Sequence, residues 1–193
     1  MARGYPISLS LAGRKCVVVG GGAEAALRAR SLLESGARVV VVALDSAAVI
    51  NDPALVGVAV ERRELRESDL DDAWLVVQVT RDAALAAELA QLCEQRRLFF
   101  CAVDQPEDSS YSHLALARAG SLTVAIGTEG QAPALARRLR EELSRVLSEA
   151  GAADEVTRLA ALRVETPEAE RREVLGRAVA DVHLTGALRF KKP

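Results

Sequence analysis

Residues 16–43 contain two short apolar runs that are joined by three glycines and a segment of helical length. The runs CVVVG and ARVVVVA are rich in β-branched residues and show no polar alternation, which is typical of strands buried on both faces. Between them, apolar residues recur at helical spacing, and Gly36 lies where such a helix would end. Two strands joined in this way form a βαβ unit, and its strands must be parallel.

The same alternation continues along the chain. Further strands are expected within residues 56–62, 73–79 and 98–103, and a helix is expected over residues 82–96. Because helices alternate with buried strands, the pattern predicts an α/β fold with a Rossmann-type doubly wound parallel sheet. Residues 104–120 break the pattern, since they are rich in turn formers and then weakly helical.

The segments on either side of this pattern differ from it. Residues 5–15 alternate apolar and polar residues and end in a turn, which predicts an edge strand or an ordered lead-in. Residues 121–128 predict one more strand, and Pro133 suits the first turn of the amphipathic helix that follows. An exposed strand beside an apolar helix face can pair with a second copy, so we expect a homodimer. Residues 152–193 predict two further helices.

Composition narrows the classes of protein to which the chain can belong. Of its 193 residues, half are hydrophobic and 27% are charged, as in globular proteins. The formal charge of −2 offers no basic field for a phosphate backbone and aromatic residues make up 3%, so nucleic acid is not an expected partner. No leader-like or membrane-spanning segment stands out, which favours a cytoplasmic protein without membrane contact. The three cysteines lie in apolar segments and are expected to be buried: Cys16, Cys93 and Cys101.

The turn after the first strand matches a nucleotide-binding pattern. Gly20, Gly22 and Ala25 occupy the positions of G-x-G-x-x-A between a strand and a helix. The first glycine permits a tight turn, the second lets the backbone approach a pyrophosphate, and the small third residue allows close helix packing. The helix N-terminus adds unpaired N–H groups and the positive end of its dipole. The motif predicts dinucleotide binding, and a glycine turn kept for packing alone is the alternative.

An acidic residue about 20 positions beyond such glycines usually binds the ribose of the cofactor. Asp45 is the nearby candidate, although it lies one or two positions late. A carboxylate beside the ribose repels a 2′-phosphate, so Asp45 favours NAD over NADP.

Two residues near the fifth strand are candidates for chemistry. Asp104 directly follows that strand, and ligands of such sheets bind outside the carboxyl ends of the strands. Its carboxylate is expected to face the cofactor crevice, with a turn-capping role as the alternative. His113 is a candidate base or metal ligand, or else a surface residue. Since His183 is the one other histidine, a histidine-rich metal site is excluded.

Five segments, in this order, resemble the siroheme synthase N-terminal family of precorrin-2 dehydrogenases and sirohydrochlorin ferrochelatases. They are YPISLSLAGRKCVVVGGG, ALRARSLLESGARVVVVA, DLDDAWLVVQVTRD, RRLFFCAVDQP and GSLTVAIGTEGQAPALARRLREEL. The resemblance covers residues 4 to about 148 and is far more specific than the glycine motif. It implies NAD-dependent oxidation of precorrin-2 to sirohydrochlorin, with ferrous iron as a further substrate in members that also insert the metal.

The resemblance also implies roles for individual residues. Asp104 matches an aspartate that the family requires for both dehydrogenation and metal insertion. One carboxylate can serve both reactions, because oxidation releases a proton and metal insertion displaces pyrrole N–H protons. The cofactor would be bound by Gly20, Gly21, Gly22, Ala23, Glu24, Leu44, Asp45 and Thr80. The tetrapyrrole substrate would be bound by His113, Arg118, Thr128, Arg137 and Arg138.

These assignments give an expected organisation of the chain. Residues 1–112 would form the NAD-binding Rossmann domain, residues 113–149 a dimerisation segment of strand and helix, and residues 150–193 a small helical region. The last region resembles the variable helical tail of the family only loosely.

Several positions depart from the family pattern, mostly on the substrate side. The family usually has Asp at Arg81, Asn at Ala86 and Cys101, Phe at Tyr111 and Pro at Leu114. Its Ser/Thr-Gly-Gly-x-Ser-Pro turn is GTEGQAP here. Two functions are therefore favoured: an NAD-dependent precorrin-2 dehydrogenase, with or without chelatase activity, and a catalytically diverged protein that binds a tetrapyrrole or NAD. A different Rossmann oxidoreductase or a nucleotide-gated regulatory domain is the third alternative, and such a protein would neither bind nor convert the tetrapyrrole. Formation of NADH from precorrin-2 and NAD distinguishes them.

Overall fold

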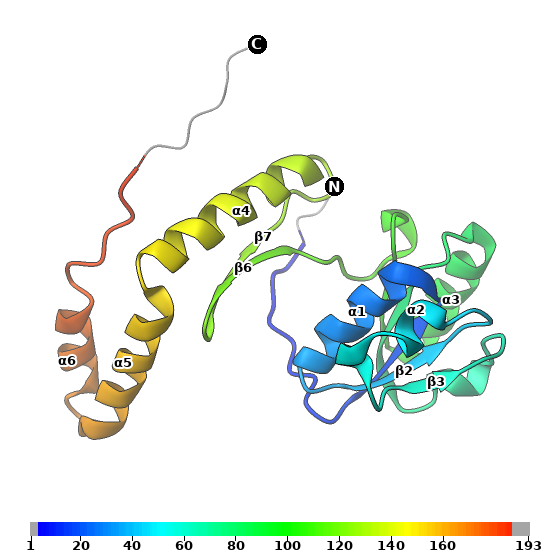
Figure 1. Ribbon diagram of the computed structural model, residues 1–193, viewed down its shortest axis with the longest axis horizontal. Coiled ribbons are helices and arrows are strands. Elements are labelled where there is room, and N and C mark those ends of the chain that lie inside the picture. The colour runs from blue at the N-terminus through cyan, green and yellow to red at the C-terminus, as the bar shows by residue number, and fades with distance from the viewer. Residues whose placement is uncertain (1–3, 187–193) are drawn as a thin grey trace, which may run out of the picture. The chain divides into compact units, whose positions relative to one another are not determined.

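The computed structural model describes residues 4–186 and divides into two compact units, with the boundary between His113 and Leu114 (Figure 1). The first unit holds a five-stranded sheet with helices, and the second holds a two-stranded hairpin and three helices. Within residues 4–186, no helix is both long enough and apolar enough to cross a membrane.

The strands of the first unit form one parallel sheet in the order β3-β2-β1-β4-β5. They are β1 (Lys15–Val19), β2 (Arg38–Val42), β3 (Ala59–Glu61), β4 (Ala73–Gln78) and β5 (Phe99–Ala102). The chain runs outward from the central β1 to β2 and β3, then crosses to the other side of β1 for β4 and β5. This order confirms the predicted doubly wound sheet.

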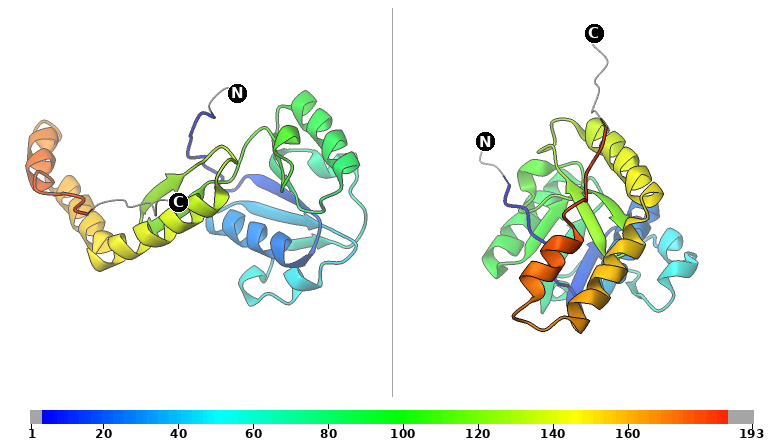
Figure 2. Two further views of the ribbon diagram at one scale, coloured as in Figure 1. Left: turned by 90° about the horizontal axis from the view of Figure 1, so that it is seen from above. Right: turned by 90° about the vertical axis from the view of Figure 1, so that its left-hand side faces the viewer.

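Helices pack on both faces of the sheet (Figure 2). They are α1 (Gly22–Glu34), α2 (Ala47–Ile50) and α3 (Ala83–Arg96), with the 3-10 turns η1 (Pro53–Leu55), η2 (Glu67–Leu70) and η3 (Pro106–Asp108). Successive side chains of β1 point to opposite faces. Cys16 and Val18 pack with the buried alanines of α1, whereas Val17 and Val19 pack with the buried face of α3. Both faces of β1 are therefore covered, which explains its uninterrupted apolar sequence.

The three cysteines lie in the first unit. Cys16, Cys93 and Cys101 are buried and free, as predicted. Burial raises the pKa of the Cys16 and Cys93 thiols to about 11. Both thiols therefore stay protonated at neutral pH and pack as small apolar groups.

Residues 4–14, which precede β1, form no strand. The prediction of an edge strand in this segment is therefore wrong, and the alternative prediction of an ordered lead-in holds. The segment enters the sheet at β1, and this central strand already has β2 and β4 as its neighbours. Its apolar residues pack instead on the α1 side of the core, where Leu11 is buried and Leu9 is partly buried.

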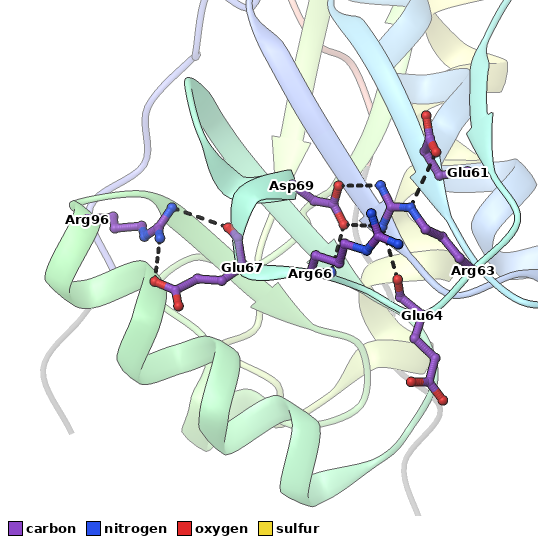
Figure 3. Close-up of polar contacts among 7 residues, drawn as sticks. All are labelled: Glu61, Arg63, Glu64, Arg66, Glu67, Asp69 and Arg96. Atoms are coloured by element: carbon purple, nitrogen blue, oxygen red, sulfur yellow. Dashed lines mark hydrogen bonds and ion pairs between the residues drawn. The ribbon is translucent and has the colours of Figure 1, made fainter.

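Ion pairs close the loop between β3 and β4 and tie it to α3 (Figure 3). This loop clamp consists of Arg63, Glu67, Asp69, Asp71 and Arg96. Both Nη atoms of Arg63 donate to the Asp69 carboxylate at 2.7 Å. Arg96, at the end of α3, donates to Glu67 at 2.5 Å and to Asp71 at 2.8 Å. The Arg63 guanidinium lowers the pKa of Asp69 to about 2, so this pair stays charged over the physiological range.

The second unit begins with an antiparallel hairpin and continues as helices. Its elements are β6 (Ala115–Ala119), β7 (Leu122–Ile126), α4 (Pro133–Glu149), α5 (Ala152–Glu165) and α6 (Arg171–Ala178). The strand within residues 121–128 and the helix from Pro133 are confirmed. The tail prediction of two helices is confirmed within the described residues, while residues 187–193 lie outside them.

The structure corrects the weakly helical expectation for the residues before Gly120. They form β6, because Gly120 adopts a left-handed conformation at φ +57° and closes a turn that pairs β6 with β7. Along β6, Ala117 is buried, whereas Leu116 and Arg118 on either side of it are exposed. Alanine and leucine favour helices as isolated residues, but pairing across the hairpin overrides that preference.

Candidate dinucleotide-binding site

The carboxyl ends of β1 and β4 mark the point where the strand order reverses, because β1 lies between β2 and β4. In open α/β sheets, ligands bind in the crevice at this switch point. The predicted glycine turn follows β1, and Thr80 follows β4. The two segments are in contact, since a Cβ on Gly20 would lie 2.8 Å from the Thr80 Cγ2 atom.

Each glycine of the turn is required for a different reason. Gly20 and Gly22 have φ values of +112° and +79°, and any residue with a side chain would have a strained backbone at these values. A Cβ on Gly21 would lie 1.7 Å from the carbonyl oxygen of Asp45, so backbone packs directly on backbone there. A Cβ on Gly22 would meet nothing within 4 Å, which leaves room for a ligand against the turn. These contacts fit a pyrophosphate cradle.

The N-terminus of α1 opens at this turn. Gly21 is its N-cap residue, and no side chain caps the helix, so its first N–H groups remain available to an anion. The carboxylate of Glu24 lies in the first turn, but it is paired with Arg28 at 2.6 Å. Ala25 is fully buried, as a close contact between helix and strand requires. The helix end can therefore hold the negative charge of a pyrophosphate.

Leu44 and Asp45 follow β2 at the same edge of the sheet. Leu44 is 68% exposed, and its side chain offers an apolar surface to a base. One carboxylate oxygen of Asp45 accepts a hydrogen bond from the Ala47 N–H at 3.1 Å. The contact of its backbone with Gly21 places this residue beside the glycine turn, as a ribose-binding acid would be.

The last residue of β4 and the turn after it present two groups whose contacts sequence reasoning missed. Gln78 is fully buried, and its amide nitrogen donates to the Thr80 Oγ1 atom at 2.5 Å and to the Asp82 carbonyl at 3.1 Å. Arg81 has a left-handed backbone at φ +59° and binds Asp104 at 2.9 Å. Gln78 could have been noticed in the sequence as the one polar residue of an apolar strand, but its hydrogen-bond partners could not be predicted from the sequence.

Asp104 follows β5 and also has a left-handed backbone, at φ +64°. Its side chain is 62% exposed, and its carboxylate pairs with Arg81 at 2.9 Å. The contacts therefore connect Gly20, Thr80, Arg81 and Asp104 along one edge of the sheet. We call Gln78, Thr80, Arg81 and Asp104 the crevice cluster.

His113 lies at the end of the first unit and contacts aromatic residues. Its ring meets the Tyr111 ring edge-on with centroids 5.2 Å apart, and Tyr111 in turn meets Phe99 at 6.5 Å. His113 is exposed to solvent, and partial desolvation by its neighbours and then the positive charge of Arg28 lower the pKa of its imidazole. Its imidazole is therefore neutral at pH 7, which suits a hydrogen bond to a ligand better than an ion pair.

The remaining candidate substrate residues belong to the second unit. Thr128 lies in the turn before α4, and its hydroxyl accepts a hydrogen bond from the Ala132 N–H at 3.3 Å. Arg137 and Arg138 are exposed on α4, where Arg138 pairs with Glu142. Within residues 4–186, no group of three or more His, Cys, Asp or Glu side chains is arranged to hold a metal ion.

Two family models match the chain in sequence. The family described as "Putative NAD(P)-binding" matches residues 7–113, and the one described as "Sirohaem biosynthesis protein central" matches residues 119–145. Siroheme synthase of Enterobacter sp. (strain 638) is 38% identical over 143 residues, which are 74% of this chain and 31% of that protein. Siroheme synthase 2 of Cronobacter sakazakii is equally similar, at 38% over 143 residues and the same shares. The chain thus spans about a third of the length of these curated relatives.

A solved structure is similar over almost the whole chain. SirC, a precorrin-2 dehydrogenase, superposes with a TM-score of 0.75 at 29% identity and covers 92% of this chain and 90% of its own. The match extends beyond the glycine turn and includes the region of the second unit. With its doubly wound sheet and open helix N-terminus, the chain belongs to the NAD(P)-binding family of siroheme synthases.

Proposed function

We propose that this protein oxidises precorrin-2 to sirohydrochlorin with NAD. The observation that carries the proposal is the row of contacts from the glycine turn through Thr80 and Arg81 to the carboxylate of Asp104. It brings a candidate proton acceptor to the sheet edge at which the cofactor would bind. The names of the relatives, siroheme synthase and precorrin-2 dehydrogenase, support the choice of substrate.

Different residues of the first unit would bind different parts of the cofactor. The N–H groups at the start of α1 would hold the pyrophosphate, with Gly20 and Gly22 allowing its close approach. Asp45 would bind the ribose hydroxyls and so favour NAD over NADP, while Leu44 would face the adenine. The nicotinamide ring, when bound, accepts the hydride that leaves the substrate.

Asp104 would take the proton that leaves with the hydride. Its exposed carboxylate can reach a ligand in the crevice, and a positioned carboxylate is a suitable general base. Arg81 pairs with that carboxylate, but an exposed ion pair is weak and readily exchanged. A carboxylate of the tetrapyrrole can replace Asp104 on Arg81, which frees Asp104 for the reaction. His113, Arg118, Thr128, Arg137 and Arg138 remain proposed contacts of the substrate.

Insertion of ferrous iron into the product is a second candidate activity. The same exposed carboxylate could accept the pyrrole protons that the metal displaces, with iron as a substrate. The proposal also includes a homodimer and a cytoplasmic location. Leu116 of β6 and Leu135 of α4 are more than a third exposed on the segment where we propose that a second copy pairs.

The test is incubation of the protein with precorrin-2 and NAD while NADH absorbance is followed, with NADP run in parallel. Steady NADH formation with release of sirohydrochlorin is expected. Binding of both ligands without NADH formation would instead identify a catalytically diverged binding protein. Addition of ferrous iron to the product in the same cuvette tests the chelatase activity.

A further inference from the structure

Gln78 is a fully buried polar side chain at the last position of an apolar strand. Its neighbours in the sheet are Val19 of β1 and Ala102 of β5, so apolar strands flank it on both sides. Burial of an amide is unfavourable unless its polar atoms are hydrogen-bonded. The partners of this amide therefore indicate why the residue is present.

The orientation of the Gln78 amide follows from one of these partners. The carbonyl oxygen of Asp82 accepts hydrogen bonds only, so the amide atom that faces it at 3.1 Å must be the nitrogen. That nitrogen carries two hydrogens, and the second is directed to the Thr80 Oγ1 atom at 2.5 Å. Gln78 thus donates to the Thr80 hydroxyl and accepts nothing from it.

This contact determines what the Thr80 hydroxyl can do. The oxygen accepts from Gln78 and, more weakly, from the Asp82 N–H at 3.4 Å. With its lone pairs used in this way, its own proton must point elsewhere. Thr80 is exposed, and its methyl group packs against Gly20 of the glycine turn. The hydroxyl proton is therefore available to an acceptor in the crevice.

Stability does not explain the presence of Gln78. Its Oε1 atom is buried and has no hydrogen-bond partner among the residues that the structure describes, which is unfavourable for folding. The Asp82 carbonyl does not depend on Gln78, because it also accepts from the Ala86 N–H at 2.9 Å. An apolar side chain of the same size would leave no further buried group without a partner.

We propose that Gln78 is a positioning residue for the cofactor: it fixes the Thr80 hydroxyl as a donor toward an oxygen atom of the bound dinucleotide. The inference rests on the proposed binding of NAD at this edge of the sheet. Gln78 itself does not touch the cofactor. It acts through Thr80, so the two side chains form one functional unit.

The experiment is a titration of the full chain with NAD, without tetrapyrrole, for the wild type and for Gln78→Met, Thr80→Val and the double variant. Methionine keeps the volume of Gln78 without the amide, and valine keeps the shape of Thr80 without the hydroxyl. Each single variant should bind NAD about three- to tenfold more weakly, as expected for one hydrogen bond. The double variant should bind no more weakly than Thr80→Val, because both changes remove the same contact. The melting temperature of Gln78→Met should equal or exceed that of the wild type.

The matched control is Gln95→Met on the exposed side of α3, which should leave NAD affinity unchanged. Unchanged NAD affinity in Gln78→Met, or losses that add in the double variant, would overturn the inference. If Gln78→Met does not fold, the inference is overturned because the side chain is then needed for stability. The proposed function fails separately: a wild type that binds NAD but forms no NADH from precorrin-2 contradicts the function and leaves the role of Gln78 intact.

Discussion

The loop clamp joins the segment before β4 to the end of α3, and the crevice cluster lies at the carboxyl ends of β4 and β5. The two clusters use charged and polar groups in opposite ways. In the loop clamp, Arg63 and Asp69 form a two-pronged pair, and Arg63 lowers the pKa of Asp69 to about 2. In the crevice cluster, the Gln78 Oε1 atom has no partner within residues 4–186, and Arg81 and Asp104 form an exposed pair.

Two residues of the crevice cluster also have an unusual backbone conformation. Arg81 and Asp104, both in the crevice cluster, are non-glycine residues in the left-handed region. Such a conformation costs about 1–2 kcal/mol, which an exposed ion pair does not offset. The clamp therefore serves to hold the loop, whereas the crevice keeps strained and incompletely bonded groups that a ligand can use.

The largest expected effect is the loss of turnover in Asp104→Asn. Asparagine tolerates the left-handed backbone and keeps the size of the side chain, but it accepts no proton. We expect kcat for precorrin-2 oxidation to fall by about 10²–10⁴-fold. NAD affinity and melting temperature should stay close to the wild type. Near-normal NADH formation by this variant would remove Asp104 from the reaction.

Gly21→Ala tests whether the glycine turn takes part in NAD binding together with the crevice cluster. The added Cβ would lie 1.7 Å from the Asp45 carbonyl oxygen, so the turn must shift. We expect NAD affinity to fall by at least about tenfold and the free energy of unfolding to fall by about 1–3 kcal/mol. Gly176→Ala, where a Cβ would meet nothing within 4 Å, is the control: it should leave NAD affinity unchanged, and it should not lower the free energy of unfolding because alanine favours the helix α6.

Asp69→Asn tests the clamp as a purely structural feature. Asparagine has a single acceptor oxygen, so one of the two hydrogen bonds from Arg63 is lost and the other is weakened by the loss of charge. The free energy of unfolding should therefore fall by about 1–3 kcal/mol. NAD affinity should not change. A substantial loss of affinity in a variant that remains folded would show that the two clusters are coupled.

The same pair predicts how stability depends on acid. The pKa of Asp69 is about 2 in the folded protein and about 3.9 when unfolded, so its contribution is present above about pH 4. It is lost as the pH falls from about 4 toward 2. Chemical unfolding at several pH values should therefore give a smaller acid dependence in Asp69→Asn than in the wild type.

The smallest expected effect is that of Arg81→Asn. Asparagine keeps the left-handed backbone accessible, while the contact to Asp104 and to a substrate carboxylate is lost. We expect KM for precorrin-2 to rise by about two- to fivefold with kcat little changed, since the pair is exposed. A fall in kcat with unchanged KM would instead assign Arg81 to the chemical step.

Local patterns predicted most of the first unit. The glycines after β1 and the end of α1 before Gly36 depend on residues a few positions apart, so the sequence was sufficient. Asp104 was expected at the carboxyl end of its strand, and it lies there. The residues around β6 were predicted incorrectly, because hairpin pairing decided their conformation.

By itself, the sequence determined the doubly wound sheet, the glycine turn and the buried cysteines, because each follows from hydrophobic period or from backbone freedom within a short segment. Only the tertiary structure decided which polar groups meet. Arg81 and Asp104 are 23 positions apart and become partners because β4 and β5 are adjacent and parallel. The orientation of Gln78 likewise depends on the turn after β4, which brings Thr80 and the Asp82 carbonyl to the same amide nitrogen. Such contacts depend on strand order and turn geometry, which no local period of the sequence records.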